Sequence, residues 1–194
     1  MTNTANKTQD MILCALFAAL IAVGAWLRIP TPLVPITLQT LFVLLAGLLL
    51  GGRRAAISVL VYIFIGLLGV PVFAEGGGLG YLLKPSFGYI IGFAAGAYWT
   101  GRIAHGTESP SYLRLLLATL AGLAVIYLCG LIYLYLISNL FLDASLGLWA
   151  LLLYGFLLTL PGDLALCAAA AWLAKRLLPV IPRRTVAKKQ HPSG

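Results

Sequence analysis

Charged residues are scarce in this sequence. Only 9% of its 194 residues are Asp, Glu, Lys or Arg, whereas 61% are hydrophobic. The chain has 13 basic residues, five acidic residues and two histidines. A soluble domain carries about 25% charged residues, and the mean hydropathy here is +1.01. This composition excludes an ordinary soluble domain and predicts an integral membrane protein. The length suits one compact helical bundle without a separate soluble domain.

Common enzyme motifs are also absent. The sequence contains no GxxxxGK(S/T) phosphate loop, no HExxH zinc motif and no GxSxG nucleophile turn. Cys14, Cys129 and Cys167 lie in apolar runs, where a free cysteine behaves as a small hydrophobic residue. We therefore expect no catalytic residues, metal site, cofactor or disulfide.

Six apolar segments can cross a bilayer, whose core requires about 20 helical residues, or fewer when neighbouring helices shield the ends. They predict an all-α membrane domain over residues 11–174, between a short tail at 1–10 and a basic tail at 175–194. The first segment is expected to stay as a helix, because Ala25-Trp26-Leu27 is a poor signal-peptide cleavage site. The segments cover about 11–27, 36–50, 55–69, 87–101, 113–137 and 147–173.

The distribution of Lys and Arg predicts the orientation in the cell membrane. If the N-terminus lies inside, six crossings leave only Arg28 and Lys84 on the outer side. Short cytoplasmic loops carry an excess of Lys and Arg, so both termini are predicted to be cytoplasmic. This explains the net charge of +8 without a nucleic-acid partner. The basic tail is expected to meet anionic lipid head groups.

Asp163 is the strongest single indication of a binding site. It lies in the last apolar segment, 12 residues before Lys175, which places it about 18 Å from the inner interface. An ionisable residue inside a membrane helix indicates a functional site by default. The structural alternative is that Pro161-Gly162 breaks the helix and Asp163 caps the segment that follows.

Gln39 and Thr37 lie at a similar outer level. Counted back from Arg53, Gln39 is about 21 Å from the inner interface. Its amide can donate and accept hydrogen bonds to a ligand. The alternative is a hydrogen bond between helices, and Thr37 can instead bond to its own backbone.

The loop between the third and fourth segments contains further candidates. Its glycines allow close approach of a ligand to the backbone, and its tyrosines combine an apolar face with a polar tip. Lys84 can pair with an anionic ligand group, or reach past the interface to water. Glu75 can pair with Lys84, but we favour a solvent-facing carboxylate. The candidate contacts are Gly77, Gly78, Gly80, Tyr81, Lys84 and Tyr89, and the tyrosines can alternatively form an aromatic belt.

Together these residues fit a ligand with hydrogen-bonding atoms at one end, an acid at the other and an apolar middle. The first segment carries a different pattern, because alanines recur there at three- and four-residue spacing. A small face allows close helix packing, either inside the bundle or against a second membrane protein. The alanines are Ala15, Ala18, Ala19, Ala22 and Ala25.

Three blocks of this sequence resemble the BioY family, the biotin-binding S components of energy-coupling factor (ECF) transporters. The blocks are VPITLQTLFVLLAGLLLG at 34–51, GVPVFAEGGGLGYLLKPSFGYIIGF at 69–93 and PGDL at 161–164. The resemblance implies six membrane helices and high-affinity capture of external biotin without catalysis. It also implies a membrane coupling subunit and two cytoplasmic ATPases as partners, with Ala15 and Ala19 of the small face contacting the coupling subunit.

The resemblance also implies that Asp163 bonds the ureido ring of biotin. The family commonly has a lysine three residues later, where this sequence has Leu166. Our hypothesis is that Lys84 replaces that lysine as the partner of the biotin carboxylate. Two other functions stay open: an S component for another vitamin, and a membrane enzyme using Asp163 as acid or base. The sequence also leaves open whether the chain works alone, as a homo-oligomer or with the ATPase module.

Overall fold

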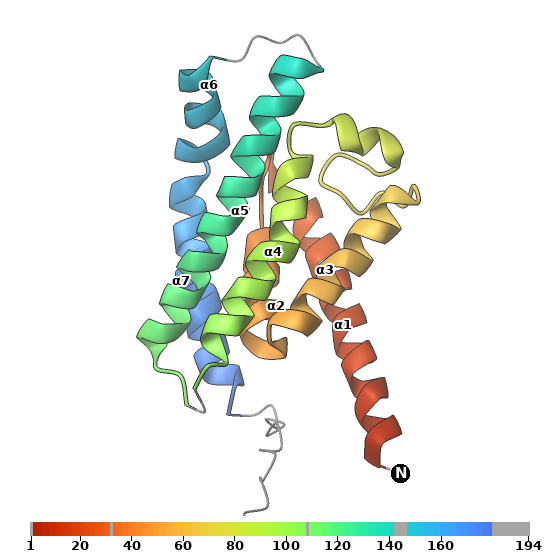
Figure 1. Ribbon diagram of the computed structural model, residues 1–194, viewed down its shortest axis with the longest axis vertical. Coiled ribbons are helices and arrows are strands. Elements are labelled where there is room, and N and C mark those ends of the chain that lie inside the picture. Colours follow the sequence, from red (N-terminus) through yellow and green to blue (C-terminus); the bar gives the residue numbers. More distant parts are fainter. Residues whose placement is uncertain (1, 32, 108, 142–146, 180–194) are drawn as a thin grey trace, which may run out of the picture.

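The computed structural model describes residues 2–31, 33–107, 109–141 and 147–179. These residues form an all-helical bundle with one two-stranded ribbon (Figure 1). Its elements are α1 (Thr2–Trp26), β1 (Arg28–Ile29), β2 (Ile36–Thr37), α2 (Gln39–Leu50), α3 (Gly52–Leu67), the 3₁₀ helix η1 (Leu79–Leu83), α4 (Phe87–Ala104), α5 (Tyr112–Leu140), α6 (Leu148–Leu152), the π-helical turn η2 (Leu153–Leu157) and α7 (Leu160–Leu177).

Six helical segments result when α6, η2 and α7 are taken as one, and each predicted apolar segment corresponds to one of them. Three are long and apolar enough to span a membrane unaided: Lys7–Trp26, Tyr112–Leu140 and Leu148–Leu177. Large apolar side chains such as Phe64, Leu128 and Trp172 are more than half exposed. An apolar exterior of this kind matches a hydrocarbon solvent rather than water. The protein is therefore an integral membrane protein.

Helix α2 is the centre of the bundle. It packs against α1, α3, α4, α5 and α7, and most of its side chains are buried. Around it, α4 and α5 run side by side (Figure 1), with glycine at their closest approach. A Cβ atom added at Gly122 of α5 would overlap the Thr100 hydroxyl of α4. Small residues at such positions let membrane helices pack closely without a hydrophobic driving force.

Two segments between helices, called the outer segments below, close the end of the bundle that lies away from the N-terminus (Figure 1). Between α1 and α2, β1 pairs antiparallel with β2, with Arg28 opposite Thr37 and Ile29 opposite Ile36. Between α3 and α4, the chain forms a tight loop in which Phe73 and Gly76 bridge, followed by η1. Gly76 and Gly78 have positive φ angles of 118° and 94°, a conformation that favours glycine.

The two ends of the chain differ in detail from the predicted tails. Helix α1 begins at Thr2, so residues 2–10 of the predicted tail continue the first membrane helix. Asp10 on this extension pairs with Arg54 of α3 at 2.9 Å. Because both residues are polar, hydropathy alone does not predict that the helix extends to include this contact. Helix α7 continues to Leu177 and includes Lys175 and Arg176. Most of the basic tail, residues 180–194, lies outside the described residues.

The alanine face of α1 divides between the bundle and the exterior. Ala18 is 6% exposed and Ala25 is fully buried, so both pack inside the chain, as one of the two interpretations of the spacing predicted. Ala15 and Ala19 are exposed, and Ala22 is half-buried. Only the outward half of the small face is therefore accessible on the surface of the described bundle.

Candidate functional site

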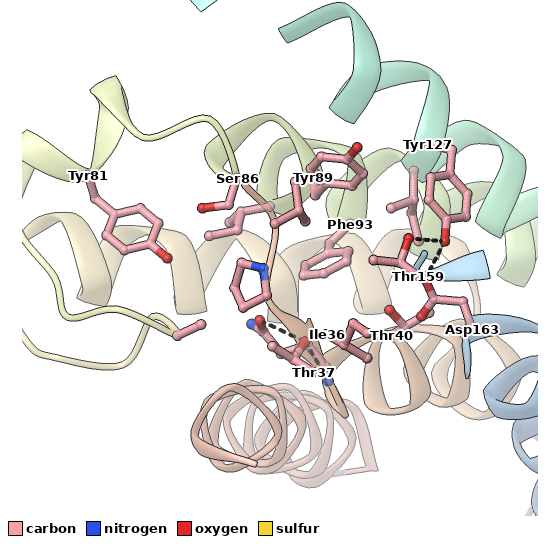
Figure 2. Close-up of a pocket in the computed structure, with 16 residues that line it drawn as sticks. Ile36, Thr37, Thr40, Tyr81, Ser86, Tyr89, Phe93, Tyr127, Thr159 and Asp163 are labelled. Atoms are coloured by element: carbon pink, nitrogen blue, oxygen red, sulfur yellow. Dashed lines mark hydrogen bonds between the residues drawn. The ribbon is translucent and has the colours of Figure 1, made fainter. Parts of the chain in front are cut away.

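A pocket lies between the two outer segments and the helices α2, α4, α5 and α7 (Figure 2). Five predicted site residues line it together: Gln39, Thr37, Tyr81, Tyr89 and Asp163. They come from β2, α2, η1, α4 and α7, so the fold assembles the site from distant parts of the chain. The other lining residues are Val34, Pro35, Ile36, Thr40, Ala74, Ser86, Ile90, Phe93, Ile126, Tyr127 and Thr159.

Asp163 occupies one end of the pocket in a polar cluster. The Tyr127 hydroxyl donates to its Oδ2 at 2.6 Å, and the Thr159 hydroxyl lies 2.8 Å from the same phenol oxygen. Thr40 faces the carboxylate from α2 (Figure 2). The N-cap of α7 is Thr159 rather than Asp163. The carboxylate therefore lines the pocket and does not cap the helix, although it lies in the first turn of α7.

The helix break near Asp163 has a different form from the one expected at Pro161-Gly162. The irregularity is the π-helical turn η2 at Leu153–Leu157, and α7 starts directly before Pro161. Proline is well tolerated in the first turn of a helix because its missing N–H has no intrahelical partner there. The π turn presents the Gly155 carbonyl to the Tyr89 hydroxyl, which donates at 2.6 Å.

Gln39 connects the pocket to its outer loop. The amide Nε2 donates to the Tyr62 hydroxyl at 2.7 Å, and that hydroxyl donates to the Val72 carbonyl at 3.2 Å. The Thr37 hydroxyl donates to Gln39 Oε1 at 3.3 Å. Gln39 thus links α2 to α3, as the structural interpretation predicted, and it also lines the pocket.

Lys84 and the predicted glycines lie outside the lining. Lys84 Nζ pairs with Glu75 Oε2 at 2.7 Å, so our preference for a Glu75 that faces only solvent was wrong. Their opposite charges attract, and the fold of the loop brings the two side chains together. Gly77 and Gly78 shape that loop: the Gly78 N–H donates to the Gly66 carbonyl at 2.7 Å, and a side chain at Gly77 would overlap the Val70 carbonyl.

Several lining residues were not found from the sequence. Tyr127 and Thr159 touch Asp163 or its partner, Ser86 is the N-cap of α4, and Phe93 lies in the second turn of that helix. Thr159 had a usable signal, because it precedes Asp163 by four residues and so shares its helix face. Tyr127 and Ser86 had none, since a lone tyrosine in an apolar helix and a serine before one are common.

Comparisons with known proteins agree on one family. The model of the BioY family matches residues 1–183. A probable biotin transporter BioY from Lysinibacillus sphaericus is 47% identical over 175 residues, which cover 90% of this chain and 89% of that protein. The biotin transporter BioY of Rhizobium etli is 35% identical over 196 residues, which cover 92% and 99%.

A solved structure supports the same assignment. The crystal structure of the S-component for biotin from an ECF-type ABC transporter matches with a TM-score of 0.79 and 27% sequence identity. The match covers 92% of this chain and 95% of that one. Sequence similarity and fold similarity thus extend over nearly the whole chain. The chain belongs to the BioY family.

Proposed function

We propose that this protein takes up biotin as the S component of an ECF-type transporter. It binds biotin without chemical conversion, and ATP hydrolysis belongs to partner subunits. Family membership and the matched S-component for biotin support this function. The main structural support is the pocket, where the Asp163 carboxylate of a membrane helix faces an apolar and aromatic interior.

The chemistry of the pocket suits the two ends of biotin. The ureido ring offers N–H donors, and the Asp163 carboxylate is an acceptor at one end of the pocket. Hydrogen bonds to a charged acceptor are about twice as strong as neutral ones. Phe93 and Ile126 supply apolar surface for the fused rings and the hydrocarbon tail. Gln39, Thr37, Tyr81 and Tyr89 are the further proposed contacts, whereas Lys84 reaches the ligand only if its ion pair with Glu75 opens.

We further propose that the end of the bundle closed by the two outer segments faces the outside of the cell, and that both chain termini face the cytoplasm. The α2–α3 junction and the ends of α4 and α7 lie at one end of the bundle, and the segments after α1 and α3 lie at the other (Figure 1). The first group of segments contains Arg53, Arg54, Arg102 and Lys175 and the second contains Arg28 and Lys84, which supports this orientation. Biotin then enters from outside, and the segments after α1 and α3 close over it. A coupling subunit docks on the exposed Ala15 and Ala19 of α1, and two ATPases drive inward release.

Calorimetric titration of the purified protein with biotin tests the function. We expect tight binding by the wild type and a loss of about 10- to 100-fold in Asp163→Asn, because a hydrogen bond to a charged group contributes about 1.5–3 kcal/mol. Asp10→Asn is the matched control. It makes the same chemical change in the Asp10–Arg54 ion pair, away from the pocket, and should bind normally.

The outcomes separate the ligand from the residue. Wild-type protein that is folded but binds no biotin refutes the function, and titration with a panel of other vitamins then follows. Tight biotin binding that survives Asp163→Asn keeps the function and removes the role of Asp163.

A further inference from the structure

Two hydroxyl groups at the end of the pocket away from Asp163 make no hydrogen bond of normal geometry within the described part of the chain, and they lie near enough to each other to interact. They are the Tyr81 phenol and the Ser86 hydroxyl. Tyr81 is 3% exposed and Ser86 is 6% exposed, and both line the pocket. A buried polar group without a partner costs about 1–3 kcal/mol. Such a group at a binding site indicates that a ligand supplies the missing partner.

Their placement separates them from the Asp163 cluster. In Figure 2, Tyr81 and Ser86 lie together on one side of the pocket, while Tyr127, Thr159 and Asp163 lie on the other. Asp163 is the one residue with a formal charge among the described lining residues. A second anionic group is therefore best placed at the Tyr81–Ser86 end, where its repulsion from Asp163 is weakest.

The local backbone also favours an anion there. Ser86 is the N-cap of the 18-residue helix α4, but its side chain makes no capping hydrogen bond. Its φ and ψ of −72° and −14° are helical, whereas a capping serine is typically extended. The hydroxyl is thus free of the helix backbone and can donate into the pocket. The N-terminus of a helix carries a partial positive charge, which stabilises an anion in the first turn.

Tyr81 is held as a hydrogen-bond donor. Its ring packs against Phe73, with centroids 4.5 Å apart. Burial raises the pKa of the Tyr81 phenol above its ordinary value of 10, so the group keeps its proton at neutral pH. Lys84, the candidate we proposed from the sequence, is bound to Glu75 at 2.7 Å and is absent from the lining.

We propose that Tyr81 and Ser86 form the subsite for the ligand's carboxylate, each donating one hydrogen bond to it. The proposal rests on biotin being the ligand and adds how the acid end is held. In this arrangement the neutral Tyr81 and Ser86 hydroxyls and the N-terminus of α4 stabilise the ligand carboxylate, in place of the positive charge of a lysine. The ureido ring then meets Asp163, and the length of the ligand spans the apolar middle.

The test is calorimetric titration of the full chain with biotin and with biotinol, in which a CH₂OH group replaces the carboxylate. The wild type should bind biotin about 10- to 100-fold more tightly than biotinol, as expected when hydrogen bonds to a charged group are lost. Ser86→Ala and Tyr81→Phe should each weaken biotin about tenfold and leave biotinol nearly unchanged, so that the preference shrinks. Ser86→Thr keeps the hydroxyl and should keep the preference.

Two controls make the result specific. Thr100→Val removes another buried hydroxyl without a hydrogen-bond partner, located between α4 and α5 outside the lining, and should change neither affinity. Lys84→Met should leave the preference for biotin over biotinol intact. If Tyr81→Phe fails to fold, the comparison of Ser86→Ala with Ser86→Thr decides the matter.

The proposal is overturned if both hydroxyl variants keep the full preference, or if Lys84→Met alone removes it. Equal affinity of the wild type for biotin and biotinol also overturns it, while biotin binding that depends on Asp163 would leave the proposed function standing. A wild type that binds neither compound instead refutes the proposed function itself.

Discussion

A single phenol oxygen joins the pocket to its outer loop, and its removal should loosen that loop. Tyr62 lies in α3 with 1% of its surface exposed. Its hydroxyl accepts from Gln39 Nε2 at 2.7 Å and donates to the Val72 carbonyl at 3.2 Å. Its ring meets Phe73 edge-on at 5.3 Å, so Tyr62→Phe keeps this packing and deletes only the two hydrogen bonds.

The size of the effect follows from those two bonds. Each contributes about 0.5–1.5 kcal/mol net, and a buried amide and carbonyl left unpaired raise the total to about 2–4 kcal/mol. Even a loss of about 2 kcal/mol shifts an equilibrium between closed and open loop about 30-fold toward the open form. The same loss should lower the thermal midpoint of unfolding and accelerate the dissociation of biotin.

Hydrogen–deuterium exchange of the peptide over residues 70–83 measures the loop directly. The N–H groups of Phe73, Gly76 and Gly78 donate to backbone carbonyls in the closed loop, so loosening should accelerate their exchange. Tyr112→Phe is the matched control, because its exposed hydroxyl makes only a 3.5 Å contact with the Ala168 carbonyl. Unchanged exchange and unchanged biotin dissociation in Tyr62→Phe would show that these bonds do not hold the loop.

Two further predictions concern packing and partner docking. Gly122→Ala should destabilise the bundle by about 1–3 kcal/mol through overpacking between α4 and α5, measured as a lower unfolding temperature, whereas Gly80→Ala points into open space and should be neutral. Ala15→Leu and Ala19→Leu should abolish co-purification with the ECF coupling subunit while biotin affinity is retained. The control Ala124→Leu changes an exposed alanine of α5, and this variant should still co-purify with the coupling subunit. Equal stability of the glycine variants, or co-purification that survives both leucines, would contradict the respective argument.

The helices could be predicted from the sequence because the bilayer imposes a length on each apolar run. Five of the six predicted segments end within about four residues of the observed helices, since hydropathy marks the boundary where polar loops begin. The exception is the start of α1. The ion pair between Asp10 and Arg54 joins polar residues from two distant segments, and a hydropathy window does not register such a contact.

The pocket was predictable mainly from polar residues that are out of place in lipid and from the tyrosines of the loop and of the start of α4. Asp163 and Gln39 were found because a charged or amide group inside a membrane helix is expensive. Ser86 and Tyr127 are ordinary residues for their local positions, and they gain meaning only from tertiary contacts. Lys84 is the opposite case. Its charge led to its prediction as a ligand contact, but its side chain pairs with Glu75 and does not line the pocket.

The arrangement of helix starts supports the proposed carboxylate subsite in a pocket with one formal charge among its described lining residues. Helices α2 and α4 begin at Gln39 and Phe87, and residues from the first turn or N-cap of each line the pocket. Two positive helix ends therefore face one space, and each favours an anion in its first turn. In the first turn of α2, Thr40 already faces the Asp163 carboxylate. In the proposed subsite the ligand carboxylate lies at the start of α4, next to the Ser86 hydroxyl that has no hydrogen bond of normal geometry among the described residues. This placement would set the direction in which the ligand binds.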